Sequence, residues 1–173
     1  MKLFSQVANF QEHLQQAKRN LFFLSRINKE IIDCTDWQVT TCFYSCLHLL
    51  NAYLAQEQNL HYNSHRDMEQ ALNWANATSI VKLSENDFTN YQMLRNLSRR
   101  SRYLCTDTGN HSGPAEVTRD KQLAKSIKAL DKVIHFFISK YPSEKIEPIE
   151  VDCPSLIGEQ LRYFQIQKVS GSI

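Results

Sequence analysis

The segment from Asp36 to Ala55 carries polar and aromatic side chains at helical spacing within an otherwise apolar stretch. On a helix that turns about 100° per residue, these side chains form one polar stripe, consisting of Trp37, Thr41, Tyr44, His48 and Asn51. A helix that is apolar on its other sides is usually buried. Because an unpaired buried polar group costs about 1–3 kcal/mol, we expect the stripe to meet other polar groups, a second subunit or a ligand.

Two histidines have neighbours that suit acid–base chemistry. His48 shares the stripe with Tyr44, and His65 opens the sequence His65-Arg66-Asp67 at a predicted helix start. Since an imidazole titrates near neutral pH, either histidine could act as a general base or acid. The structural alternative is a hydrogen-bonded core histidine for His48. For His65-Arg66-Asp67, the structural alternative is a helix cap combined with a salt bridge to another helix.

Arginines gather near the end of the third long helix that the sequence predicts. Arg95, Arg99 and Arg102 form one helical stripe beside its apolar face. Guanidinium groups present a rigid fork of donors that matches phosphates and carboxylates. Together with Arg66, these side chains predict a phosphate or RNA contact. The alternatives are a solvated face, or arginines that hold carboxylates such as Asp36 inside the protein.

Metal and cofactor chemistry finds little support in the sequence. Cys42 and Cys46, like His61 and His65, have the spacing of two ligands to one ion, but neither pair has an obvious second pair of ligands. The two cysteines also lie on the apolar side of their helix, so we predict that they pack in the core and that no metal is bound. No P-loop, dinucleotide fingerprint or nucleophile elbow is present, and we predict no cofactor.

Composition indicates one soluble helical domain. The 173 residues are 42% hydrophobic with a net charge of +2, so a nucleic-acid partner must be argued from a local patch. Only four glycines and four prolines favour long helices. An odd count of five cysteines argues against a secreted disulfide framework. Without a signal-peptide pattern or a membrane-length apolar run, we expect a cytoplasmic protein that is not in the membrane.

Hydrophobic periodicity predicts four long helices, at about residues 5–32, 35–58, 84–105 and 115–141, and a short helix at about 65–76. We therefore predict an all-α, up-and-down four-helix bundle with an extra short helix and an irregular C-terminal tail. Residues 1–142 would form the bundle, and residues 143–173 a tail or small appendage. The segment 159–169 reads equally as a short helix or a strand. Asn28, the only polar residue in the first helix seam, should have a hydrogen-bond partner.

An ordered set of residues between about positions 30 and 105 resembles a known family. The set is Asp36-Trp37, Phe43-Tyr44, Leu47-His48, Ala52-Tyr53-Leu54, Ser64-His65-Arg66, Tyr91, Leu94 and the run from Leu97 to Tyr103. It is similar to that of small prokaryotic HEPN-like proteins, a name that abbreviates higher eukaryotes and prokaryotes nucleotide-binding. The first and last long helices match that family only in shape.

The resemblance implies an all-α bundle that pairs as a homodimer, with a site at the dimer cleft that acts on RNA. Some HEPN proteins pair with a small nucleotidyltransferase as a toxin–antitoxin couple, and others act in phage defence. The resemblance also suggests that Asp36, Tyr44 and His48 face Arg66 and the arginines of the third long helix. The resemblance therefore implies that these same arginines bind RNA or a nucleotide in this protein.

One departure bears on catalysis. Nucleolytic HEPN proteins carry an arginine followed by a histidine after four to six intervening residues, whereas Arg102 reaches His111 only after eight. Metal-independent RNA cleavage therefore cannot be carried over to this chain. A variant site is the alternative, in which His48 or His65 abstracts the 2′-hydroxyl proton and Arg66, Arg99 and Arg102 stabilise the phosphate charge.

Two functions follow from these observations. The first is a HEPN-like homodimer that binds RNA or a nucleotide phosphate at an arginine-lined cleft. The second is a non-catalytic protein–protein interaction module, in which the polar cluster of Asp36, Tyr44 and Asn51 is structural.

Overall fold

The computed structural model describes residues 9–31, 34–60, 62, 64–103 and 115–167. The described residues form helices α1 (Phe10–Glu30), α2 (Thr35–Gln58), α3 (His65–Leu72), α4 (Glu85–Tyr103) and α5 (Ala115–Lys140), followed by strand β1 (Ile149–Val151), a 3₁₀ helix η1 (Pro154–Leu156) and strand β2 (Phe164–Ile166). This confirms the predicted all-α bundle with an extra short helix. None of these helices is long and apolar enough to cross a membrane.

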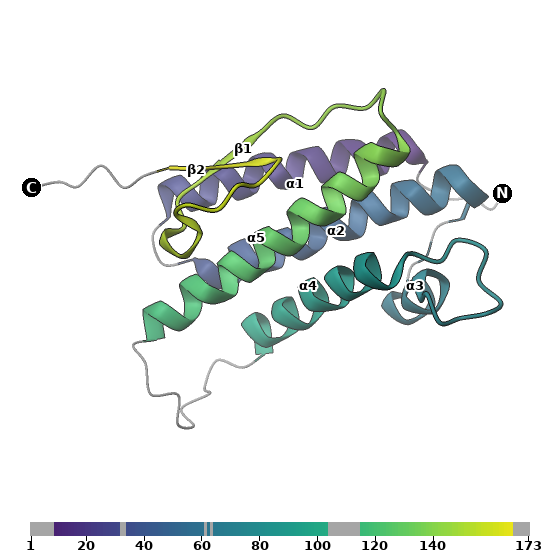
Figure 1. The fold of residues 1–173 in the computed structure, drawn as a ribbon, viewed down its shortest axis with the longest axis horizontal. Coiled ribbons are helices and arrows are strands. Elements are labelled where there is room, and N and C mark those ends of the chain that lie inside the picture. Colours follow the sequence, from purple (N-terminus) through teal and green to yellow (C-terminus); the bar gives the residue numbers. More distant parts are fainter. Residues whose placement is uncertain (1–8, 32–33, 61, 63, 104–114, 168–173) are drawn as a thin grey trace, which may run out of the picture.

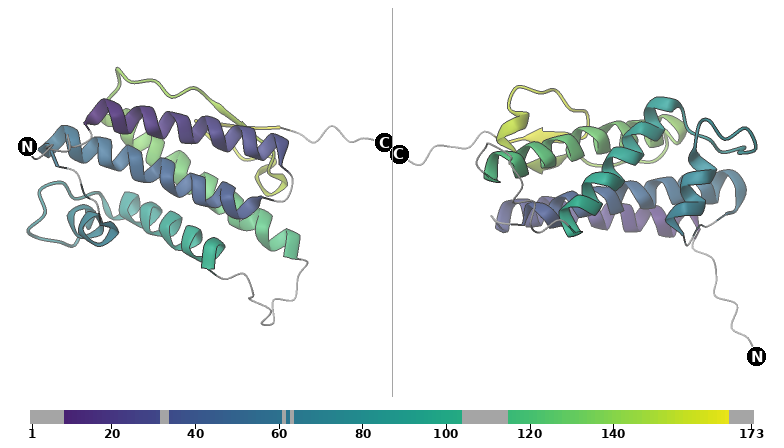
Figure 2. Two further views of the ribbon diagram at one scale, coloured as in Figure 1. Left: turned by 180° about the vertical axis from the view of Figure 1, so that it is seen from behind. Right: turned by 90° about the horizontal axis from the view of Figure 1, so that it is seen from below.

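Helix α2 lies at the centre of the bundle. It contacts α1, α4 and α5, and the other large helix contact joins α4 to α5. The views from both sides show α1, α2 and α4 in a row, with α5 crossing one face of that row and α3 beside the start of α4 (Figures 1 and 2). The largest fully buried side chains come from all four long helices and include Leu14, Phe43, Tyr91 and Phe137. The bundle therefore has one continuous core, with α2 as its middle element.

Side-chain caps fix where three helices begin. Helix α1 starts at Phe10, later than predicted, because Asn9 is its N-cap and forms a capping box with Glu12. The Oδ1 atom of Asn9 accepts from the Glu12 backbone N–H at 3.0 Å. Ser64 and Ser84 cap α3 and α4, and the hydroxyl of each accepts the backbone N–H of the residue three positions further along.

Helix α2 spans the predicted residues 35–58, with Cys34 at the N-cap position. The end of helix α3 differs from the predicted one. Helix α3 ends at Leu72, although the spacing predicted a helix to residue 76. The backbone of Asn73 is extended, and its side-chain oxygen accepts the N–H of residue 75 at 2.9 Å. Such a local side-chain bond offers the backbone an alternative to the next helical turn.

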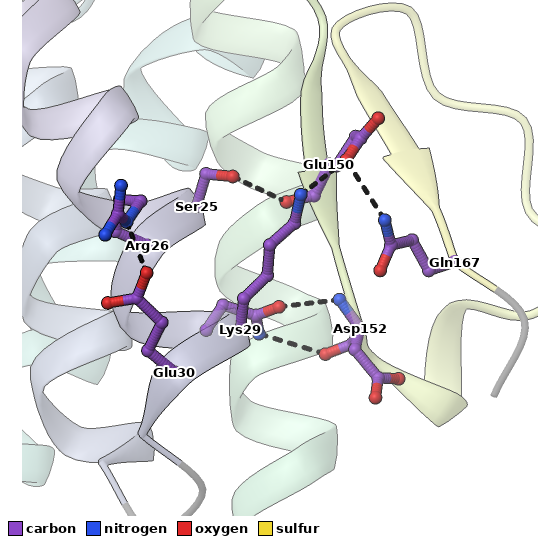
Figure 3. Close-up of polar contacts among 8 residues, drawn as sticks. Ser25, Arg26, Lys29, Glu30, Glu150, Asp152 and Gln167 are labelled. Carbon is purple, nitrogen blue, oxygen red and sulfur yellow. Dashed lines mark hydrogen bonds and ion pairs between the residues drawn. The ribbon is translucent and has the colours of Figure 1, made fainter.

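The tail after residue 142 is more ordered than predicted. Strands β1 and β2 pair in parallel, with Ile149 opposite Phe164, so part of the ambiguous segment 159–169 is a strand. Figure 3 shows the tail held against α1: Ser25 Oγ donates to the Glu150 carbonyl at 3.1 Å, and Lys29 forms an ion pair with the Glu150 carboxylate. Buried side chains of the tail join the same core as the helices, so the tail covers one side of the bundle.

Asn28 has the hydrogen-bond partners that its position in the seam demanded. Its Nδ2 donates to Gln38 Oε1 of α2 at 2.9 Å and to the Asp152 carbonyl at 3.0 Å. Its Oδ1 accepts the Asp152 backbone N–H at 2.6 Å. One amide therefore joins α1, α2 and the tail.

Replacing Asn28 with alanine should lower the free energy of unfolding by about 2 kcal/mol, since the buried Gln38 side chain and the Asp152 backbone lose their hydrogen bonds. Urea denaturation followed by circular dichroism measures this loss. Gln15→Ala, at an exposed position of α1, is the control and should change stability by less than about 0.5 kcal/mol. Equal stability of the two variants would contradict the bridging role.

Candidate functional site

The predicted site residues lie on two separate parts of the bundle. His65, Arg66, Arg95, Arg99 and Arg102 come from α3 and α4 and are called the arginine face below. Trp37, Thr41, Tyr44 and His48 of the polar stripe lie beside α1.

His65 is the first residue of α3 and the only histidine of the arginine face as defined above. Its ring lies 5.6 Å, centroid to centroid, from the buried ring of Phe43. Partial burial, followed by the positive charges of Arg95 and Arg102, lowers the pKa of His65 below its usual 6.5. These surroundings favour the neutral form of the imidazole, which lies within the field of two guanidinium groups of α4.

Arg95 is held by a carboxylate of α3. It forms an ion pair with Glu69, and Gln92 Nε2 donates to the other oxygen of that carboxylate at 3.3 Å. Both charged side chains are about three-quarters buried. For Arg95, the arrangement matches the structural alternative, in which an arginine holds a carboxylate. The sequence does not identify Glu69 as this partner, because nothing in the spacing shows which face of the short helix meets α4.

The other arginines of the face have different surroundings. Arg66 and Arg99 are exposed, and neither forms an ion pair with any residue that the structure describes. Arg102 is partly buried, and its Nε donates to the Ser98 carbonyl at 3.3 Å. Asp36, the carboxylate proposed to hold such arginines, is exposed and likewise forms no ion pair within the described ranges. Arg66 and Arg99 are therefore available to an outside anion.

The pKa of His65 should rise toward 6.5 when Arg95 is replaced by glutamine, because one of the two positive charges that lower it is removed. Two-dimensional NMR of the histidine ring protons, recorded as a function of pH, measures the pKa of His65.

The same shift makes stability depend on pH. Because the pKa of His65 is lowered in the folded state, the folded protein binds fewer protons than the unfolded chain. Stability therefore falls as the pH drops through 6.5, and Arg95→Gln should reduce this fall. Arg100→Gln is the control, and an equal shift in both variants would contradict the assigned cause.

The polar stripe of α2 meets α1. The Nδ1 atoms of His48 and His13 are 3.2 Å apart, so one ring donates and the other accepts. His13 is almost fully buried, at 4% exposure. The sequence interpretation missed it, although its position three residues after Phe10 placed it on the apolar face of α1. The suggestion that His48 and Tyr44 face the arginines of the third long helix is thus not what the structure shows.

A cavity of about 240 Å³ opens between α1 and α2. It is called the stripe cavity below, and its lining consists of Gln16, Asn20, Phe23, Trp37, Thr40, Thr41, Tyr44 and His48. Asn51, the last member of the stripe, is buried outside this lining, and its Oδ1 has no hydrogen-bond partner in the described part of the chain. A larger cavity of about 510 Å³ lies between α3 and the segment 76–81. Neither lining contains an arginine.

The cysteines of α2 pack in the core, as predicted. Cys42 and Cys46 are fully buried, and burial raises the pKa of both thiols far above the usual range. Among the residues whose placement is described, no group of three or more histidine, cysteine or acidic side chains is arranged to hold a metal ion.

Comparisons with protein-family models, with curated proteins and with solved structures found no match to this chain. The interpretation of the site therefore depends on its own geometry.

Proposed function

We propose that this protein binds RNA or nucleotide phosphates through the arginine face. The observation that carries the proposal is the gathering of arginines on two helices, Arg66 on α3 and three more on α4, which the ion pair of Glu69 with Arg95 holds together. Arg66 and Arg99 add two exposed guanidinium groups that no described carboxylate neutralises. Such groups bind phosphate oxygens through paired donors.

The resemblance to HEPN-like proteins supports the rest of the proposal. On that basis the protein would act in the cytoplasm as a homodimer, within a toxin–antitoxin pair or a phage-defence system, with a small nucleotidyltransferase as its partner. RNA cleavage is a second candidate, which the neutral state of His65 favours, since a neutral imidazole can accept the 2′-hydroxyl proton. Incubating RNA with the wild type and with His65→Ala/Arg102→Ala tests cleavage, and equal degradation by both would point to a contaminant.

Binding is tested by fluorescence anisotropy of a labelled single-stranded RNA. The wild type should bind, and Arg99→Gln should bind several-fold more weakly, because one phosphate contact is lost. Arg19→Gln is the matched control, since it removes the same charge from an exposed position of α1. Absence of RNA binding by the wild type would refute the proposal and favour the protein–protein interaction module.

Glu69→Gln should change RNA binding in the opposite direction. Removing the carboxylate frees the Arg95 guanidinium from its ion pair and raises the net charge of the arginine face by one. We expect RNA affinity to rise several-fold in the same anisotropy assay. Gln70→Ala, one residue along α3, should leave it unchanged. A decrease in affinity in Glu69→Gln would place the RNA away from Arg95.

A further inference from the structure

We propose that the stripe cavity binds one planar heteroaromatic ring with hydrogen-bonding atoms at its edge. This inference does not depend on the arginine face, because it concerns an uncharged ring and a different pair of helices.

Aromatic side chains from both helices surround the opening of the cavity. Phe23 of α1 and Trp37 of α2 are 50% and 65% exposed, which is high for large apolar side chains. Tyr44, one helical turn away from the Thr40 and Thr41 positions, is partly buried in the same lining. Aromatic rings in such positions can stack on a flat ligand, and stacking on a base is worth about 1–3 kcal/mol.

Amide groups of α1 supply a polar edge. Gln16 Nε2 donates to Asn20 Oδ1 at 3.0 Å, which orients both side chains. This leaves Gln16 Oε1 as an acceptor and Asn20 Nδ2 as a donor, and neither atom makes a hydrogen bond within the described part of the protein. An adjacent acceptor and donor complement the amide-like or amidine-like edge of a heteroaromatic ring.

A buried hydroxyl in the wall also lacks a partner. Thr40 is 3% exposed, and its Oγ1 makes no hydrogen bond to any described residue. The hydroxyl of the next residue does have a partner, because Thr41 Oγ1 donates to the Trp37 carbonyl at 2.7 Å. An unsatisfied buried hydroxyl is costly, and at a cavity wall it is a group that a ligand can satisfy.

The size of the cavity limits the ligand to one ring system. Its volume of about 240 Å³ is below the roughly 300–1,000 Å³ of sites that hold drug-sized molecules. The hydrogen-bonded pair of His13 and His48 fixes the position of one lining side chain. The ring could belong to a free nucleoside or to an unstacked base of an RNA strand, and the experiment below separates these sources.

The experiment uses Trp37 as its reporter. The chain has two tryptophans, so a Trp74→Phe background leaves Trp37 as the only one. Adenosine, guanosine, cytidine and uridine carry no phosphate charge and are titrated one by one. We expect saturable quenching of Trp37 fluorescence by at least one nucleoside or, if the base must be presented by a strand, by a short single-stranded RNA. Ionic strength should not affect the nucleoside result.

Two variants locate the ligand. Asn20→Ala removes a donor at the edge, and Thr40→Val replaces the hydroxyl with a methyl group of similar size. Each should weaken binding about tenfold, which corresponds to about 1.4 kcal/mol. Gln70→Ala, in the larger cavity, and Arg99→Gln, on the arginine face, should leave nucleoside binding unchanged. Absence of quenching by every nucleoside and by RNA would overturn the inference. Quenching that is equal in the wild type and both cavity variants would also overturn it.

Discussion

Replacing Phe43 with alanine is expected to lower the free energy of unfolding by about 3–5 kcal/mol. Phe43 lies in the central helix and is only 1% exposed. Its ring contacts those of Tyr44, His65 and Tyr91, so it joins the core of α2 and α4 to the start of α3. Truncation leaves a cavity that these elements can only partly close, and urea denaturation measures the loss.

The same variant connects the core to the arginine face. Because burial is the largest cause of the lowered pKa of His65, removing the ring beside it should raise that pKa toward 6.5. Phe22→Ala is the control, since Phe22 is 67% exposed on α1 and its loss should cost less than about 1 kcal/mol. A loss below about 1 kcal/mol in Phe43→Ala would contradict the packing described for this site.

The helices could be predicted from the sequence because their signals are local. The apolar spacing of α2 and the serine caps Ser64 and Ser84 each act within one or two turns of chain. The short reach of these signals also explains the errors. The helix start at Phe10 depended on a capping box at Asn9, and the early end of α3 depended on the side chain of Asn73.

The candidate sites could be predicted only in part, because periodicity shows which residues share a face but not what that face meets. Four of the five residues of the polar stripe line one cavity, yet the partner of His48, His13, lies 35 residues earlier in the chain. Glu69 and Arg95 are likewise 26 residues apart, and their pairing depends on how α3 packs beside α4. Family resemblance suggested that His48 faces the arginines, whereas the packing of α1 alongside α2 brings His48 against His13.

The second large effect is expected in the variant Arg66→Gln/Arg99→Gln. Both side chains are exposed and form no ion pair with described residues, so each can bind a phosphate and displace a counterion from the RNA. Removing both should weaken RNA binding at moderate salt by tenfold or more. Neither change touches the core, so thermal unfolding should be close to that of the wild type.

The salt dependence of RNA binding tests the central claim, that the arginine face holds phosphates. Each phosphate contact contributes about −0.7 to the slope of log K against log salt for a single strand. The slope should therefore be shallower by about 1.4 in Arg66→Gln/Arg99→Gln. The matched control Arg19→Gln/Arg119→Gln, with two exposed arginines of other helices replaced, should keep the wild-type slope. Equal slopes in the two double variants would contradict the claim.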